Sequence, residues 1–391
     1  MPVLQQSFTL KVEYPVLFCK GVFKKDSDLL KKVLLSHGTA PRKVLAVVDD
    51  NLFHSQPEVM GQLRSWLEYH EIDLNTTPEI EIIKGGEMVK NDTEGIDAFL
   101  KSMNDLGLCR HSAVLAIGGG AMLDAVGYAC SIFHRGLRLV RLPSTVLSQN
   151  DSGVGVKNGI NYFDKKNFLG TFTPPFAVIN DFELLSSLPK RDRVAGCAEA
   201  VKVALLKDSD FFDWIEVHAR MIQDGEEAPM EQLIFRCAEL HLKHIGGSGD
   251  PYESGSSRPL DFGHWAAHKL EALSQYELRH GEAVGIGLAL DCVYAQLKGW
   301  ISELDLNRVL GCLENLGLQT YHPLLSKGLD ETKGAQNILR GLYEFREHLG
   351  GELTIATLEA IGKSRDIHEL DVTILKTAVD LLAKRNAEKS Y

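Results

Sequence analysis

The sequence predicts an α/β amino-terminal domain with a Rossmann-like sheet, followed by an all-α carboxy-terminal domain. In the first half of the chain, short β-rich runs alternate with amphipathic helical segments, whereas the second half is almost entirely helical in pattern. The length of 391 residues exceeds what one ordinary hydrophobic core supports. We place the boundary near residue 185, where the pattern changes, and expect domains over 1–185 and 186–391.

The elements of the first domain follow one another as strand, helix, strand, helix. Buried strands are predicted over 43–49, 79–84, 112–117 and 138–142, and helices over 58–70, 92–104 and 122–133. This order indicates a parallel sheet with crossover helices. In the second domain we expect helices within 191–245, 263–300, 304–316 and 372–389.

Bulk composition limits the classes of function. The hydrophobic fraction of 44% and the charged fraction of 24% are typical of a globular protein. A net charge of −11 argues against nucleic acid or an anionic membrane as a general partner, although an anionic small molecule stays possible. The seven cysteines are odd in number and form no C-x-x-C pair, and the chain starts without a signal-peptide pattern. We therefore expect a cytoplasmic protein with reduced thiols.

Three turns at predicted strand ends could hold a nucleotide. Glycines 118–120 join a strand to a helix, and such a turn exposes backbone N–H groups to a pyrophosphate. This is not the G-x-G-x-x-G fingerprint, and alone it could be a tight turn without a ligand. Asp49, Asp50 and Asn51 follow an earlier strand, and glycines 85–86 with Glu87 and Lys90 follow the next. Three such turns at one sheet edge favour a dinucleotide.

Histidine and glutamate residues in the second half suggest a metal site. His264 and His268 are four apart and share one helix face, and His280 begins another helical segment. Glu199 lies in a third. One carboxylate and two imidazoles with an open position are typical of catalytic zinc. No dense motif links these residues, so each histidine taken singly could instead be a surface or core residue.

Polar residues that suit an anionic substrate gather between positions 135 and 170. They are Arg135, Asp151, Lys157, Asn161, Lys166 and Asn167. Lys157 ends a glycine-rich stretch that can present N–H groups and an ammonium to phosphate. Lys202 lies one turn after Glu199 on the same helix face. A solvated loop is the alternative interpretation for each lysine taken alone.

Several of these stretches together resemble the 3-dehydroquinate synthase family, the sugar phosphate cyclases. The matching segments are GGGAMLD, RLPSTVLSQNDSGVGVK, KKNFLGTF, LPKRDRVAGCAEAVK, DFGHWAAH and HGEAVGIG, in the family's order from about residue 40 to 290. The resemblance implies the two-domain fold described above, usually as a homodimer. It also implies NAD and a divalent metal, zinc or cobalt, as cofactors, and a small sugar phosphate as the substrate.

The resemblance assigns expected roles residue by residue. The metal ligands would be Glu199, His264 and His280. The NAD contacts would be Asp49, Asn51, Glu87, Lys90, Gly119, Gly120, Asp124, Ser144, Thr145 and Lys166. The catalytic set would be Asp151, Lys157, Lys202, Lys243 and His268. Substrate contacts would be Asn167, Arg258, Asp261 and Arg135, the last reaching the neighbouring subunit's site.

The reaction that the resemblance implies would use all of these residues. NAD oxidises a hydroxyl held by the metal, phosphate leaves by β-elimination, NADH returns the hydride, and the opened sugar closes into a carbocycle by an aldol step. His268 and the substrate's own phosphate are the candidates for moving protons.

Two positions depart from the dehydroquinate synthase pattern. An arginine stands seven residues before the first metal histidine in those enzymes, and an asparagine three before it; here these positions hold Ser257 and Asp261, with Arg258 adjacent. Asp261 would repel a substrate carboxylate but could accept a hydrogen bond from a hydroxyl. We therefore favour sedoheptulose 7-phosphate, converted to a valiolone-like cyclitol, over the dehydroquinate precursor, although Arg258 could restore carboxylate binding.

Two other classes of protein remain open. An NAD-dependent polyol-phosphate dehydrogenase could share the architecture and the glycine-rich turn, but the lysines and Asn167 favour the cyclase. A non-catalytic binding paralogue would tolerate the loss of metal and NAD positions that this sequence retains.

Overall fold

The computed structural model describes residues 3–36, 38, 40–74, 79–163, 165–247, 252, 260–329, 337–348 and 353–389. The chain divides into two compact units, Met1–Ser144 with Val156–Glu183, and Thr145–Gly155 with Leu184–Tyr391. The segment Thr145–Gly155 therefore belongs to the second unit, although it precedes the boundary expected near residue 185. It does so because it packs on helices of that unit: the Asn150 side-chain amide donates to the Gly196 carbonyl at 2.8 Å.

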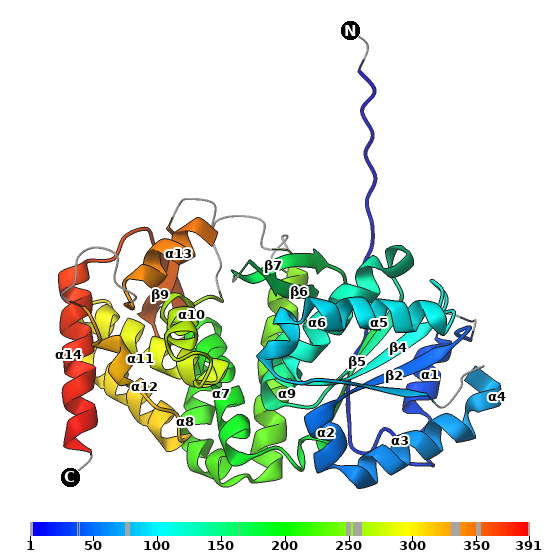
Figure 1. Cartoon of the computed structure of the whole chain (residues 1–391). Coiled ribbons are helices and arrows are strands. Elements are labelled where there is room, and N and C mark those ends of the chain that lie inside the picture. Colours follow the sequence, from blue (N-terminus) through cyan, green and yellow to red (C-terminus); the bar gives the residue numbers. More distant parts are fainter. Residues whose placement is uncertain are drawn as a thin grey trace. The chain divides into compact units, whose positions relative to one another are not determined.

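The first unit is built on a six-stranded parallel sheet (Figure 1). Its strands, in spatial order, are β1 (Val16–Cys19), β8 (Ala177–Asp181), β5 (Arg138–Pro143), β4 (Ala113–Gly118), β2 (Val44–Asp49) and β3 (Ile80–Ile83). Every residue of β2, β4 and β8 is buried, as expected of parallel strands covered on both faces. The four predicted strands are confirmed as β2, β3, β4 and β5, and β1 and β8 extend the sheet.

Helices cover both faces of this sheet, with α5 and α6 on one side and α3 on the other (Figure 1). The helices of the unit are α1 (Leu29–Leu35), α2 (Asp50–Ser55), α3 (Pro57–Tyr69), α4 (Glu71–Leu74), η1 (Glu87–Asn91), α5 (Thr93–Asp105), α6 (Gly120–Ile132) and η2 (Phe133–Arg135). The buried side of α5 and α6 packs on β2 and β4 in one apolar cluster. The glycine-rich stretch is followed by an antiparallel hairpin that was not predicted, β6 (Lys157–Tyr162) and β7 (Lys165–Phe172).

The second unit is mainly helical. Its elements are η3 (Ser148–Ser152), η4 (Phe182–Leu185) at its margin, α7 (Lys190–Lys207), α8 (Ser209–Asp224), α9 (Glu227–Gly247), α10 (His264–Leu273), α11 (His280–Leu297), α12 (Glu303–Asn315), η5 (Pro323–Leu325), α13 (Arg340–His348) and α14 (Val372–Glu388). Helices α7 and α11 are buried on almost every side, which makes them the core of the unit. The expected all-α domain also contains a short hairpin, β9 (Ile355–Ala360) and β10 (Lys363–Ile367), which turns at Gly362 with φ of 82°.

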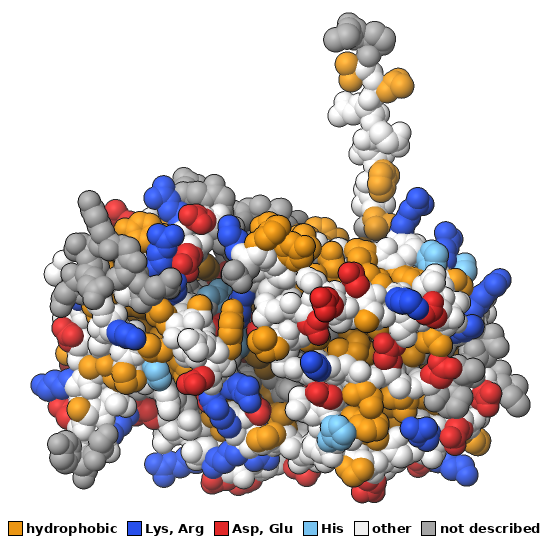
Figure 2. All heavy atoms as spheres, viewed as in Figure 1, with side chains coloured by type: hydrophobic (Ala, Val, Ile, Leu, Met, Phe, Trp, Pro, Cys, Tyr) orange, Lys and Arg blue, Asp and Glu red, His pale blue; other side chains and the backbone are white. Residues whose placement is uncertain are grey.

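Charged side chains of both signs are interspersed over the face shown in Figure 2, in agreement with a moderate net negative charge. Ahead of β1 the chain is extended and exposes Phe8 and Leu10. Among the described residues, no helix combines the length and the hydropathy that crossing a bilayer would require.

Asp181, at the end of β8, binds the backbone that follows β1, and this contact can be tested. Its buried carboxylate accepts hydrogen bonds from the backbone N–H groups of Gly21, Val22 and Glu183 at 2.9, 2.7 and 3.0 Å. Asp181→Ala would leave these amides without their acceptor, so we expect the free energy of unfolding to fall by about 3 kcal/mol in urea titrations. Glu183→Ala, which removes only a partly exposed pair with Lys24, is the control and should lower the free energy of unfolding much less. Equal losses in the two variants would contradict the assignment.

Candidate active site

Three side chains from three helices of the second unit form a compact group of metal-ligand type. Glu199 projects from the middle of α7, and His264 and His280 are the first residues of α10 and α11. Glu199 Oε1 lies 3.4 Å from the Nε2 atom of each histidine, and the three ligand atoms all lie within 4.8 Å of one another. The structure thus brings together the three residues expected to bind metal.

Both histidines are held with Nε2 facing the glutamate. Nδ1 of His264 lies 3.0 Å from the carbonyl oxygen of Phe262, and Nδ1 of His280 lies 3.2 Å from Oε2 of the buried Glu271. A hydrogen bond donated by Nδ1 leaves the Nε2 lone pair available as a ligand, and a carboxylate behind the ring raises its basicity.

The group fits a divalent cation. Glu199 is fully buried, and its Oε1 atom makes no well-formed hydrogen bond with the described residues, so three acceptor atoms face one another. Ligands about 2.1 Å from a tetrahedral zinc ion lie about 3.4 Å apart. That is the separation between Oε1 and each ring nitrogen.

Charges around Glu199 favour its ionised form. Burial acts to raise its pKa, but Lys202, His264 and His280 together hold that pKa well below the usual value. Burial likewise acts to lower the pKa of Lys202, and the carboxylates of Glu199, Asp151 and Asp261 outweigh it, so that the pKa is raised. Lys202 Nζ contacts Glu199 Oε2 and is only 3% exposed. The site therefore holds a permanent ammonium beside the metal group.

Close helix packing places the three ligands. A Cβ atom at Gly281, next to His280, would lie 1.8 Å from the carbonyl oxygen of Ala195, so α11 can approach α7 this closely only with glycine there. A Cβ at Gly287 would lie 2.1 Å from the Gly263 carbonyl oxygen, immediately before His264. The buried Asp291 of α11 completes the arrangement, because it accepts from the Gly263 N–H and from Trp265 Nε1, both at 3.0 Å. Burial raises the pKa of Asp291 to about 7.

A second polar group adjoins the first. Asp151, carried by the π-helical turn η3, lies with its Oδ1 3.2 Å from Nε2 of His241 in α9. One ligand-type atom each of Asp151, Glu199 and His241 also falls within 4.8 Å of the others. Single π-turns occur frequently at functional sites. Asp151, Glu199 and Lys202 thus come together as expected.

The other residues expected near this group are distributed as follows. His268 is exposed on α10, with its ring centroid 5.9 Å from that of His280. Asp261 precedes α10 and is half-buried. Lys243 is exposed on α9 and pairs with Glu239 at 2.8 Å, so the structure does not bring it to the cluster. Arg258 and Ser257 lie outside the described residues.

In the first unit, the three expected nucleotide turns lie at one sheet edge. Strands β3, β2 and β4 are neighbours and parallel, so their carboxyl ends adjoin. Asp49 caps α2 by accepting from the Asn51 N–H at 2.9 Å. A Cβ at Gly85 would lie 2.2 Å from Asp49 Oδ2, and one at Gly118 would lie 3.0 Å from Asp49 Cβ. Ligands bind at such carboxyl edges of parallel sheets.

Glycines 119 and 120 occupy the amino end of α6. Gly119 is its N-cap residue, with Gly120 as the first helical residue, an arrangement suited to a phosphate group. At the end of the adjacent strand β5, the Ser144 N–H donates to the Gly118 carbonyl at 2.9 Å, and Thr145 Oγ1 accepts from the Ser148 N–H at 3.1 Å.

Lys90 is almost fully buried next to these turns. Its Nζ lies 3.0 Å from Asp124 Oδ2 on α6 and contacts the Asn167 side chain on β7. Burial raises the pKa of Asp124, against the opposing effect of Lys90. The Asn167 N–H donates to Asn161 Oδ1 at 2.9 Å. This network ties the β6–β7 hairpin to the expected NAD positions.

Neighbouring residues of the hairpin complete the network. Asn161 Nδ2 donates to Glu87 Oε1 at 3.3 Å, and Lys166 Nζ lies 3.8 Å from the same oxygen. Lys157 begins β6, with an exposed side chain and a carbonyl oxygen that accepts from the buried Arg141 at 3.2 Å.

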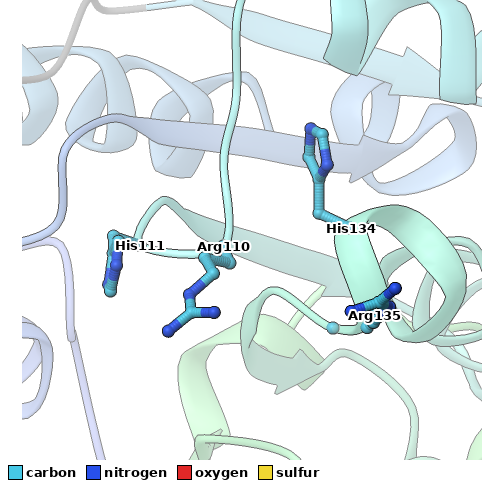
Figure 3. Close-up of a pocket in the computed structure, with 5 residues that line it drawn as sticks. Arg110, His111, His134 and Arg135 are labelled. Atoms are coloured by element: carbon cyan, nitrogen blue, oxygen red, sulfur yellow. The ribbon is translucent and has the colours of Figure 1, made fainter.

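Arg135 lies apart from these residues. It follows the carboxyl end of α6, whereas the glycines are at the amino end of the same helix. It lines a pocket of about 590 Å³ with Arg110, His111, His134 and Gly136, between the turns that precede β4 and β5 (Figure 3). The proximity of Arg135, Lys157 and Asn167 in sequence suggested that they gather in one place. Within the first unit, Arg135 does not lie with the other two.

Sequence reasoning missed three residues that shape the site: His241, Glu271 and Asp291. Each is buried and polar on a helix face that is otherwise apolar. His241 follows the buried Leu233 and Cys237 at four-residue spacing, and this inward position was the available signal.

The metal assignment can be tested without catalysis. Glu199→Gln removes the charge but keeps the volume, so we expect Zn²⁺ affinity in calorimetric titration to fall by about 100-fold or more, with the fold retained. Glu239→Gln on the surface of α9 is the matched control and should bind as the wild type does. Unchanged affinity of the Glu199 variant would refute this ligand set.

The chain is similar to known families, sequences and solved structures. The family described as 3-dehydroquinate synthase N-terminal matches residues 80–195, and 3-dehydroquinate synthase C-terminal matches residues 196–337. A 2-epi-5-epi-valiolone synthase from Actinomyces sp. is 32% identical over 387 residues, covering 95% of each chain. A 3-dehydroquinate synthase from Thermoanaerobacter pseudethanolicus is 30% identical over 364 residues, covering 93% of this chain and 96% of that one.

Solved structures agree with these relatives. The 2-epi-5-epi-valiolone synthase ValA from Streptomyces hygroscopicus subsp. jinggangensis, with NAD⁺ and Zn²⁺ bound, has a TM-score of 0.85 at 27% identity and covers 98% of this chain and 100% of its own. A 2-deoxy-scyllo-inosose synthase, at 23% identity and a TM-score of 0.74, shares the fold over 93% of this chain and 95% of its own. Matched domains, sequence relatives and fold together show that the chain belongs to the 3-dehydroquinate synthase family, the sugar phosphate cyclases.

Proposed function

We propose that this protein is an NAD- and metal-dependent cyclase that releases phosphate from sedoheptulose 7-phosphate and closes the remaining chain to a valiolone-like cyclitol. Support comes from a relative of that activity class matching 95% of the chain. The ValA structure contains bound NAD⁺ and Zn²⁺, and this supports the assignment of the same cofactors here.

The residues present suit the chemistry. Glu199, His264 and His280 would hold the metal, and residues at the β2, β3 and β4 ends would hold NAD. When bound, these groups would polarise a secondary hydroxyl and accept its hydride, which acidifies the neighbouring C–H and allows β-elimination of phosphate.

The chain's own side chains would carry the remaining work. The Lys202 ammonium would attract the anionic substrate, and Asp151 would accept a hydrogen bond from a sugar hydroxyl. His268, exposed beside His280, would move protons. Return of the hydride to the sugar would regenerate NAD, and ring opening and aldol closure would then complete the turnover.

The observation that carries the substrate preference is Asp261. Its carboxylate is close enough to Lys202 to help raise the pKa of that lysine, so it belongs to the electrostatic surroundings of the metal group. A substrate carboxylate here would meet a like charge, whereas a neutral hydroxyl end could donate to Asp261.

Dehydroquinate formation from 3-deoxy-arabino-heptulosonate 7-phosphate is the second candidate. Relatives named 3-dehydroquinate synthase are as similar as the valiolone enzyme, for example 32% over 296 residues in Vibrio atlanticus. A polyol-phosphate dehydrogenase has weaker support, because structural neighbours with dehydrogenase names are 13–16% identical and share the fold alone.

We also propose a homodimer in the cytoplasm. Arg135 stands in a basic pocket at the amino edge of the sheet, away from the strand ends expected to hold NAD. In a homodimer, Arg135 would reach the active site of the neighbouring copy and complete it.

Phosphate release decides between the candidates. Enzyme with NAD and Zn²⁺ or Co²⁺ is given sedoheptulose 7-phosphate and 3-deoxy-arabino-heptulosonate 7-phosphate in parallel, and inorganic phosphate is measured. We expect kcat/KM for the neutral-ended sugar to be higher by at least about tenfold. A chelator should abolish release and added metal restore it. Release from the carboxylate sugar alone would overturn the substrate proposal, and net NADH accumulation without phosphate would indicate a dehydrogenase.

The role of Asp261 has its own test. Asp261→Asn removes the like charge, so we expect the ratio of kcat/KM values to shift toward the carboxylate sugar by about tenfold. Glu239→Gln, a charge removed far from the metal group, should leave the ratio unchanged. An unchanged ratio in the Asp261 variant would exclude that residue as the determinant.

A further inference from the structure

We propose that His241 is a positioning residue that holds the Asp151 carboxylate toward the metal and lysine group. The inference rests on the proposed function, since Asp151 is expected there to contact the sugar. It concerns a residue to which neither the family resemblance nor the expected site assigns a role.

The His241 ring has a fixed orientation. It is 3% exposed, and its Nδ1 lies 3.0 Å from the carbonyl oxygen of Cys237, one turn earlier in α9. With Nδ1 anchored to the helix, the opposite edge of the ring points away from the α9 backbone. Nε2 is buried and lies 3.2 Å from Asp151 Oδ1, and it makes no well-formed hydrogen bond with the described residues.

Asp151 needs such a contact because its own element is small. The turn η3 spans five residues and is held to α7 through Asn150 and Gly196. A Cβ at Gly196 would lie 2.6 Å from the Leu147 backbone nitrogen, so the turn lies directly against the helix. The Asp151 side chain remains 30% exposed, however, and can turn toward water unless a partner holds it inward.

The surroundings of Asp151 favour the inward orientation. Nε2 of His241 lies 3.2 Å from Asp151 Oδ1. On the other side, Asp151 is close enough to the Lys202 ammonium, which also contacts Glu199, to help raise the pKa of that lysine. Removing His241 would leave Asp151 with one of these two partners.

His218 shows how a structural histidine differs. Its Nδ1 lies 2.8 Å from the Trp214 carbonyl oxygen, four residues earlier in α8, which repeats the His241 anchor. Its ring stacks on Trp214 at 4.4 Å between centroids. Only His241 of this pair has a carboxylate within 4 Å of its other nitrogen. His218 is therefore a matched control.

A double-mutant cycle tests the proposal. His241→Ala, Asp151→Ala and the double variant are assayed for phosphate release from sedoheptulose 7-phosphate with NAD and Zn²⁺. If His241 acts through Asp151, His241→Ala should lower kcat/KM by about tenfold, and the double variant should be little worse than Asp151→Ala. His241→Gln, which keeps a donor, should recover part of the loss. His218→Gln should match the wild type, and Zn²⁺ affinity should be unchanged in every variant.

Two results would overturn the proposal. Losses that multiply in the double variant would show that His241 acts independently of Asp151, and wild-type activity in His241→Ala would show that it does not act. If the alanine variant does not fold, His241→Gln and His241→Phe replace it, and only the glutamine should retain activity.

A failure of the proposed function can be distinguished from a failure of the positioning role of His241. A wild-type enzyme that releases phosphate from neither sugar refutes the cyclase assignment, and crystal structures of wild type and His241→Gln or Phe then decide the positioning role. A rotated Asp151 carboxylate in the phenylalanine variant supports it, and an unmoved one refutes it.

Discussion

Glu199 Oε1 and His280 Nε2 lie 3.4 Å apart because α7 and α11 come closer together than side chains normally allow. The contact is made by Gly281 on the Ala195 carbonyl oxygen, and a single methyl group would separate the helices. Helices packed through ordinary side chains have axes about 8–10 Å apart. The second close contact, between Gly263 and Gly287, brings α10 and His264 to the same point. The metal group is thus a product of backbone packing, and Asp291 secures it by binding the start of α10.

Polar groups buried around this contact are arranged so that each has a polar partner. Lys202 contacts Glu199, Glu271 supports His280 from behind, and Asp151 meets His241. An unpaired charge would be costly at these depths. Glu199 Oε1 accepts no well-formed hydrogen bond from the described residues, and it faces the Nε2 atoms of His264 and His280. A cation between these three atoms would take the place of a donor.

The sequence predicted the sheet strands because they rest on local patterns, since short apolar runs located β2, β3, β4 and β5. Helical spacing placed His264 near His268, but the set of Glu199, His264 and His280 was expected from the family resemblance and stays a prediction. The hairpin β6–β7 was missed because polar and glycine residues interrupt its apolar positions, and its partners Lys90 and Glu87 are distant in sequence. Lys243 was expected to contact the substrate only because it matches a position of the family. Two positions correspond to about 200° around a helix, so His241 faces inward and Lys243 faces water.

The turn η3 has a consequence for how this protein can be divided. Its eleven-residue segment, Thr145–Gly155, interrupts the first unit in sequence but belongs to the second by its packing. A fragment beginning at Leu184 would contain Glu199, His264 and His280 and nearly every helix of that unit, yet it would expose the α7 surface around Gly196 and lack Asp151. The packing of the helical unit is therefore completed by a peptide that lies, in sequence, inside the first unit.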